Sequence, residues 1–135
     1  MTPSTAQCSC LCGAVRFTAA LPSKWVAHCH CTYCRRAHGA PFVTWAGFPD
    51  DQVTLDDVAS LLHWYESSKG ALRGSCSRCG TPMLFKSERW PGELHIARSL
   101  IEGPLDKNPS AHVFFETHVP WLSIEDDLPK KCSQG

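Results

Sequence analysis

The sequence predicts a mainly β, single-domain zinc-binding protein of many short strands, with at most short helical turns. Two features predict the fold class: short runs in which apolar and polar residues alternate, and the glycines and prolines that separate those runs. A third feature, nine cysteines in a chain of only 135 residues, predicts the metal.

The predicted strands are rich in Val, Phe, Trp, Tyr, Ile and Leu, the residues that strands prefer. No window carries a long 3.6-residue period, so no long helix is expected. The strands are expected at 14–19, 41–47, 61–65, 82–86, 94–98 and 112–116.

One short helix is expected at 32–38, ended by Gly39, because glycine readily adopts the left-handed conformation that closes a helix. The length suits one ordinary domain, which we place at 8–128. Residues 1–7 and 129–135 are interpreted as an N-terminal and a C-terminal tail.

Charge and hydropathy exclude several classes of partner. Thirteen basic residues balance thirteen acidic ones, so we expect no nucleic acid partner and no attraction to an anionic membrane. Apolar runs are far shorter than the roughly 20 residues of a membrane span. The start, MTPSTAQ, lacks the basic and apolar regions of a secretory signal, so a cytoplasmic location is expected.

The cysteines favour metal binding over disulfides. A disulfide scaffold is typically secreted, shorter than about 100 residues and carries an even number of cysteines. This chain has an odd number and no recognisable signal segment. In a reducing compartment its thiols remain available as thiolate ligands.

Two cysteine pairs have spacings typical of a closed structural zinc site. Cys10 and Cys12 form C-x-C, and Cys76 and Cys79 form C-x-x-C. Tight turns of this kind place two sulfurs on one metal, with bonds of about 2.3 Å. Gly13 or Gly80 follows each pair. Two such pairs from distant parts of the chain would complete a four-thiolate site and stabilise the fold directly.

A third cluster predicts an open site. Cys29, Cys31 and Cys34 supply three thiolates, which leaves one zinc position for water or substrate, as in catalytic zinc sites. The alternatives are closure by a fourth ligand, with Cys8, His30 and His38 as candidates, or free thiols.

Five segments together resemble the glutathione-dependent formaldehyde-activating enzyme family, which shares its domain with centromere protein V. They occur in family order and cover roughly residues 9–122. The segments are SCLCGAVRF, CHCTYCRRAHGAPF, SCSRCGTPMLF, SERWPGEL and HVFFETHVPWL.

The resemblance implies a β-tent fold and two zinc ions. By motif position, Cys10, Cys12, Cys76 and Cys79 correspond to the structural zinc ligands, and Cys29, Cys31 and Cys34 to the catalytic zinc site. The implied activity is that of a carbon–sulfur lyase on S-hydroxymethylglutathione-type adducts, with glutathione as co-substrate and a small thiol or aldehyde as partner.

Polar neighbours of the triple cluster are candidate glutathione contacts. Arg35 and Arg36 could offset the negative charge of a thiolate site or bind a glutathione carboxylate. His38 lies one helical turn after Cys34, where a ligand, a proton shuttle or a surface residue is possible.

Other residues receive more ordinary interpretations. His28 and His30 alternate with the cysteines, so we expect them on the opposite face of a strand and not as ligands. Trp121 is expected to pack, and His112 to pack or to line a pocket. Cys8 is interpreted as a spare redox thiol or a fourth ligand, and Cys132 as a free thiol.

Two further functions compete with the enzyme. A zinc-stabilised binding module would have the same structural site without catalysis. A thiol-based metal or redox sensor would use the spare thiols of Cys8 and Cys132.

Overall fold

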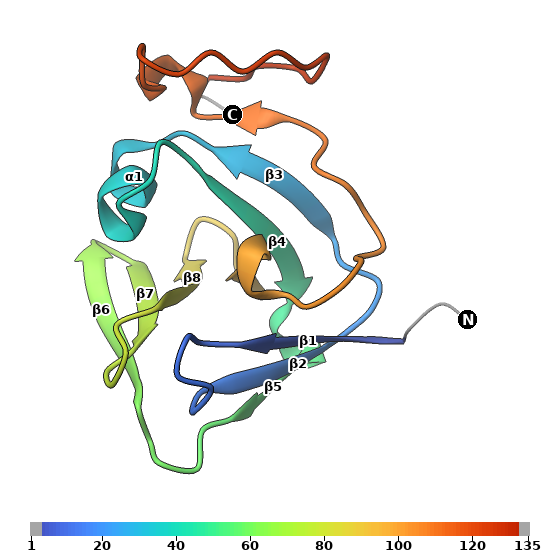
Figure 1. The fold of residues 1–135 in the computed structure, drawn as a ribbon, viewed down its shortest axis with the longest axis vertical. Helices are drawn as coiled ribbons and strands as arrows, with labels where there is room; N and C mark the ends of the chain where they lie inside the picture. The colour runs from blue at the N-terminus through green and yellow to red at the C-terminus, as the bar shows by residue number, and fades with distance from the viewer. Residues whose placement is uncertain (1–3, 133–135) are drawn as a thin grey trace.

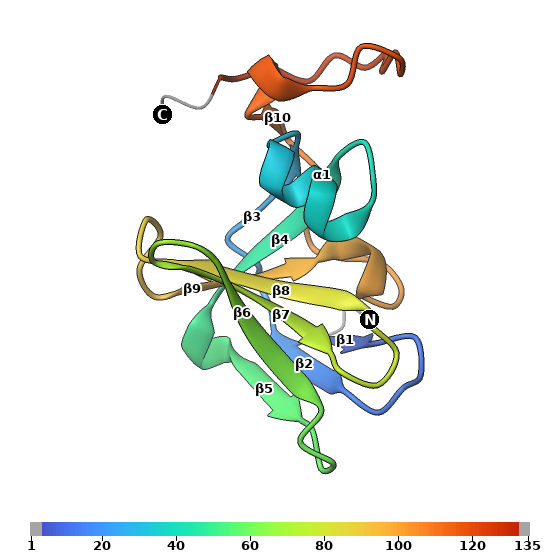
Figure 2. The ribbon, with the colours of Figure 1, turned by 90° about the vertical axis from the view of Figure 1, so that its left-hand side faces the viewer.

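The computed structural model describes residues 4–132, which form two β-sheets and one short α-helix (Figures 1 and 2). The mainly β class predicted from sequence is confirmed. The smaller sheet lies at the bottom of Figure 1, and the C-terminal segment crosses the top of the molecule.

The smaller sheet has three antiparallel strands in the order β1-β2-β5. Strand β1 spans Thr5–Ser9, β2 spans Arg16–Ala20 and β5 spans Val53–Asp56. Alternate residues of β2 point inward, so that Phe17 and Ala19 are buried. This is the two-residue period of a sheet with one face on the core.

The larger sheet has seven strands in the order β10-β3-β4-β9-β8-β7-β6. Only the β10–β3 pair is parallel among the described strands. The strands are β3 (Trp25–Cys29), β4 (Val43–Pro49), β6 (Leu62–Ser68), β7 (Ala71–Cys76), β8 (Pro82–Ser87), β9 (Glu93–Ala97) and β10 (His112–Val113).

The main hydrophobic core joins the two sheets. Phe17 of the smaller sheet belongs to the same buried cluster as Phe48, Met83 and Ile96 of the larger one. These four side chains are almost fully buried. A second, smaller cluster contains Trp45 together with the buried cysteines of the triple motif. The candidate site therefore rests on packed side chains.

The predicted helix is confirmed as α1 (Thr32–His38). Gly39 ends it in the left-handed conformation, with φ of 59°. Cys31 caps the other end, since its sulfur accepts a hydrogen bond from the Cys34 N–H. Three short 3₁₀ turns occupy Asp50–Gln52, Arg98–Leu100 and Phe115–Thr117.

Parts of the two predicted tails pair with the domain. Residues 5–7 lie in β1, hydrogen-bonded to β2, which corrects their assignment to a tail. Near the other end, the Lys131 N–H donates to the His112 carbonyl. Short polar segments give little periodicity from which to predict such pairing. The remainder of the predicted tails, 1–3 and 133–135, lies outside the described residues.

Strands β3, β5 and β7 were not predicted, because His, Arg, Asp and Gly interrupt their apolar alternation. Within residues 4–132, no helix is long and apolar enough to cross a membrane.

Replacing Gly47 by alanine is expected to destabilise the sheet. A Cβ there would lie 2.6 Å from Cζ2 of Trp25, which pairs with Gly47 across β3 and β4. The ring is held by a hydrogen bond to Glu93, at 3.3 Å. We expect a loss of ~1–3 kcal/mol in the free energy of unfolding, measured by urea denaturation. The exposed Thr54→Ala on β5 serves as the control, and an equal loss there would contradict this assignment.

Candidate functional site

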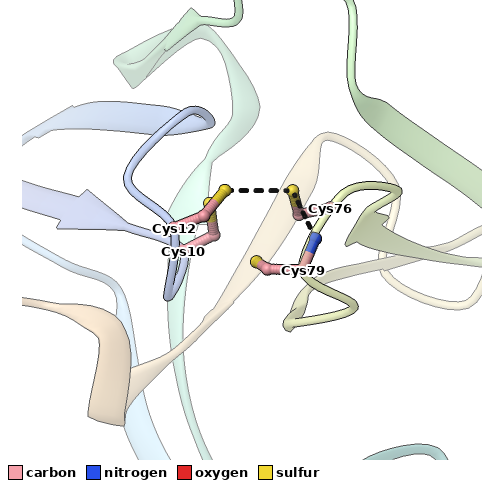
Figure 3. Close-up of side chains that lie close together, drawn as sticks. All are labelled: Cys10, Cys12, Cys76 and Cys79. Carbon is pink, nitrogen blue, oxygen red and sulfur yellow. Dashed lines mark hydrogen bonds between the residues drawn. The ribbon is translucent and has the colours of Figure 1, made fainter.

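The structure brings Cys10, Cys12, Cys76 and Cys79 into one group, with all ligand atoms within 4.8 Å of one another (Figure 3). The first two lie in the loop between β1 and β2, and the others at the turn between β7 and β8. The Sγ atoms of Cys10 and Cys12 are 3.6 Å apart, and those of Cys12 and Cys76 are 3.9 Å apart.

These distances suit a tetrahedral zinc site. Metal–sulfur bonds of about 2.3 Å imply sulfur–sulfur edges of roughly 3.8 Å. A donor set of thiolates alone also favours zinc over hard cations. Both the geometry and the chemistry of this group therefore match the metal that the sequence predicts.

The two cysteine loops are built in the same way. In each, the N–H of the following glycine donates back to the carbonyl of the first cysteine: Gly13 to Cys10 at 3.0 Å, and Gly80 to Cys76 at 2.8 Å. Both glycines have positive φ, 80° and 79°, which side chains disfavour. The glycines thus allow the chain to turn while the sulfurs point toward a common centre.

Thr81 links the two loops, a contact that sequence reasoning missed. Its hydroxyl oxygen accepts a hydrogen bond from the Leu11 N–H at 3.0 Å, and it lies 3.1 Å from the Cys79 sulfur. Hydrogen bonding from Thr81 lowers the pKa of Cys79 to about 5, which favours the thiolate. The sequence feature that could have indicated this role is the position of Thr81 directly after the C-x-x-C-G motif.

The second group consists of Cys29, Cys31 and Cys34. Cys29 ends β3, Cys31 caps α1, and Cys34 lies inside the helix. The sulfurs of Cys29 and Cys34 are 3.5 Å apart. Within residues 4–132, no fourth His, Cys or carboxylate ligand atom lies within 4.8 Å of all three sulfurs. The described residues therefore offer three ligands to a metal at this place.

The three sulfurs share their protons unequally. Hydrogen bonds from Cys29 and Cys34 lower the pKa of Cys31 to about 2, whereas hydrogen bonding to Cys31 and burial raise the pKa of Cys29. One thiolate is therefore stabilised by two neighbouring thiols. A cation could replace their protons at the same place.

Two residues outside the predicted set contact Cys34. The Trp45 indole N–H donates to its sulfur at 3.4 Å, and the Arg73 guanidinium nitrogens lie 3.7 and 3.8 Å from it. Arg73 stacks over the Phe85 ring at 4.6 Å and donates to the Ser67 hydroxyl. It was missed because β7 was not predicted, so nothing placed residue 73 near residue 34.

A cleft of about 650 Å³ adjoins the second group. Its walls are α1 on one side and strands β6, β7 and β8 of the larger sheet on the other, and α1 lies above these strands in both ribbon views (Figures 1 and 2). The polar residues with long or aromatic side chains that line it are Tyr33, Arg36, His38, Tyr65 and Arg73.

The three residues predicted to lie beside the second group do not all line the cleft. Arg36 and His38 line the cleft, whereas Arg35 does not and donates instead to the Thr117 carbonyl at 2.9 Å. His38 packs edge-on against Trp45, outside the ligand group. Burial, together with the charge of Arg73, lowers the pKa of His38 to about 4, so its imidazole is neutral at neutral pH.

His28 and His30 share a face, as the alternation predicted. Both contact the ring of His112, which is fully buried. Cys29, between them, points to the other face and joins the triple cluster. Neither histidine is grouped with the cysteine ligands.

Solvent exposure decides between the interpretations of three other residues. Cys8 is 3% exposed in the main core, where desolvation raises its pKa to about 12, so it is neither a fourth ligand nor a reactive thiol. Trp121 was expected to pack, but this is wrong, since the residue is 71% exposed. Cys132 is exposed and free.

Residues 5–117 match the model of the family described as glutathione-dependent formaldehyde-activating enzyme. The chain belongs to this family. A Halomonas elongata protein named "Putative glutathione-dependent formaldehyde-activating enzyme" is 30% identical to this chain. The match covers 94% of this chain and 85% of that protein.

Two further matches are more limited. A Schizosaccharomyces pombe protein described as an uncharacterized lyase is 30% identical over 57% of this chain and 54% of its own. A crystal structure of a Rhodobacter sphaeroides protein matches with a TM-score of 0.62, at 23% identity, over 74% of this chain and 91% of that one. At that identity the match shows the fold alone.

Replacing Cys76 by serine is expected to remove one metal ion per chain and to destabilise the fold strongly. Cys76 is 1% exposed and joins two distant loops through the four-cysteine group. Structural zinc sites contribute roughly 10–16 kcal/mol of apparent binding free energy in small zinc domains. Metal content and thermal unfolding are the measurements, with the exposed Cys132→Ser as the control. Unchanged metal content in the Cys76 variant would contradict the site.

Proposed function

We propose that this chain is a zinc-dependent carbon–sulfur lyase that acts on glutathione–aldehyde adducts of the S-hydroxymethylglutathione type. In the other direction the reaction joins the glutathione thiol to formaldehyde. One observation carries the proposal: three cysteines lie together without a fourth protein ligand among the described residues, beside a large cleft that contains two arginines.

The residues of the second group fit zinc. Cys29, Cys31 and Cys34 would hold the ion, and zinc supplies a Lewis acid that keeps a bound thiol deprotonated or polarises a carbonyl. The four-cysteine group is proposed to hold a second, structural zinc. Family membership and the names of the relatives support the substrates.

Arg73 is proposed to balance the charge of the reactive site. Three thiolates around a dication carry a net charge of −1, and a substrate thiolate would add another negative charge. The Arg73 guanidinium lies beside Cys34, and stacking on Phe85 holds it in place. Attraction over such distances is strong where protein lowers the local dielectric.

The cleft is proposed to bind the peptide part of glutathione. Glutathione has two carboxylates, and Arg36 presents an exposed guanidinium at the helical wall. The exposed Tyr33 and Tyr65 line the cleft and offer hydroxyl groups and apolar area. Arg35, bound to Thr117, is proposed to hold the C-terminal segment near α1 and not to contact substrate.

Cys31→Ser tests the proposed function. We expect the fold to persist, since the four-cysteine group is untouched, while one zinc and most of the activity are lost. Activity is measured by NMR as the exchange rate between glutathione and its formaldehyde adduct, with the uncatalysed rate subtracted. Calorimetric titration with glutathione is run in parallel. Wild-type protein that binds glutathione without accelerating exchange would instead be a binding module.

Replacing Arg73 by glutamine is expected to lower kcat/KM by roughly 10²-fold, the order of effect of removing one group that stabilises negative charge in an active site. Arg73→Lys, which keeps the charge, should recover part of the activity. Lys69→Gln, an exposed cation outside the cleft lining, controls for net charge. If both glutamine variants lose the same activity, the effect is not local to Cys34.

A further inference from the structure

A third cluster of potential ligands lies outside both cysteine groups. The ligand atoms of His28, His112 and Asp126 all lie within 4.8 Å of one another. We propose that these three residues bind a divalent first-row transition ion and thereby attach the C-terminal segment to the larger sheet. This site is independent of the proposed catalytic function and uses a different donor set.

The sheet itself places the two histidines side by side. β10 pairs in parallel with β3, and His112 is directly opposite His28 in the register. Their ring centroids are 4.9 Å apart. Asp126 comes from the segment after Trp121 that crosses the top of the molecule (Figure 1). Its carboxylate oxygens lie 2.9 and 3.2 Å from Nε2 of His112.

Each candidate ligand is held by an outer partner, as is typical of metal sites. Nδ1 of His28 lies 2.8 Å from the Thr44 hydroxyl, which leaves Nε2 outside that bond. Nδ1 of His112 lies 2.8 Å from Nε2 of His30. An oxygen of Asp126 accepts from the Leu128 N–H at 3.1 Å. The three groups are therefore oriented before any ion arrives.

The differing burial of the three residues leaves the cluster open to solvent on the side of Asp126. His112 is completely buried and His28 is half-buried, whereas the side chain of Asp126 is 31% exposed. An ion can reach the carboxylate from solvent and complete its coordination with water. Two imidazoles and one carboxylate suit zinc, iron(II), cobalt or nickel, and differ clearly from the thiolate groups.

Metal binding requires a specific rearrangement of protons. Without the ion, the tautomer of a neutral His112 that satisfies both contacts donates from Nε2–H to Asp126 and accepts at Nδ1 from Nε2–H of His30. With the ion on Nε2, His112 must carry its proton on Nδ1 and donate to His30. Both histidines therefore exchange tautomers when the ion binds, whereas a purely structural hydrogen-bond network would keep them unchanged.

The test is calorimetric titration of protein already containing two zinc ions with further Zn²⁺. We expect one additional equivalent to bind, and ¹⁵N NMR of the imidazoles should show the tautomer exchange of His112 and His30. No additional equivalent, or binding without a change in the His112 ring signals, would overturn the proposal.

Variants that leave the buried His112 itself in place locate the ion. His28→Gln and Asp126→Asn should each weaken the third equivalent at least about 100-fold, and Thr44→Val, which removes only the outer partner, about 10- to 100-fold. The matched controls are His63→Gln and Asp127→Asn, both exposed. Two retained zinc ions and an unchanged circular dichroism spectrum verify folding. Equal weakening in variants and controls would place the extra ion elsewhere.

Discussion

The grouping of four cysteine sulfurs around one point connects the parts of this fold. One loop belongs to the three-stranded sheet and the other to the seven-stranded sheet, 64 residues apart between Cys12 and Cys76. The main hydrophobic core also joins the two sheets, so the four-cysteine group is a second connection between them. A metal there would hold β7 in place, and β7 also carries Arg73 toward the second cysteine group.

Strand β7 therefore links the proposed structural zinc site to the proposed reactive site. Cys76 ends β7, and Arg73 lies three residues earlier, beside Cys34. A shift of β7 that loosened the four-cysteine group would move the guanidinium away from the thiolates of the triple group. This arrangement favours charge balance by a residue of the sheet and not by the arginines of α1, which follow Cys34 directly in sequence.

Sequence reasoning predicted what local spacing determines. The two cysteine pairs, the triple cysteine cluster, the α1 boundaries and the shared face of His28 and His30 follow from spacings of a few residues. Contacts of Arg73 and Thr81 depend on which strands become neighbours, and periodicity does not encode strand order. Trp121 was misjudged because aromatic character alone favours burial, whereas the C-terminal segment leaves this ring in solvent.

Alternation along β3 places different chemistry on its two sides. Cys29 points toward the thiolates of α1, and His28 and His30 point toward His112 and the C-terminal segment. Soft sulfur ligands thus gather on one face, and imidazole and carboxylate ligands on the other, with a single backbone between them. Because a one-residue slip of β3 against β4 would reverse both faces, the β3–β4 register that pairs His28 with Thr44 keeps the two ligand sets apart.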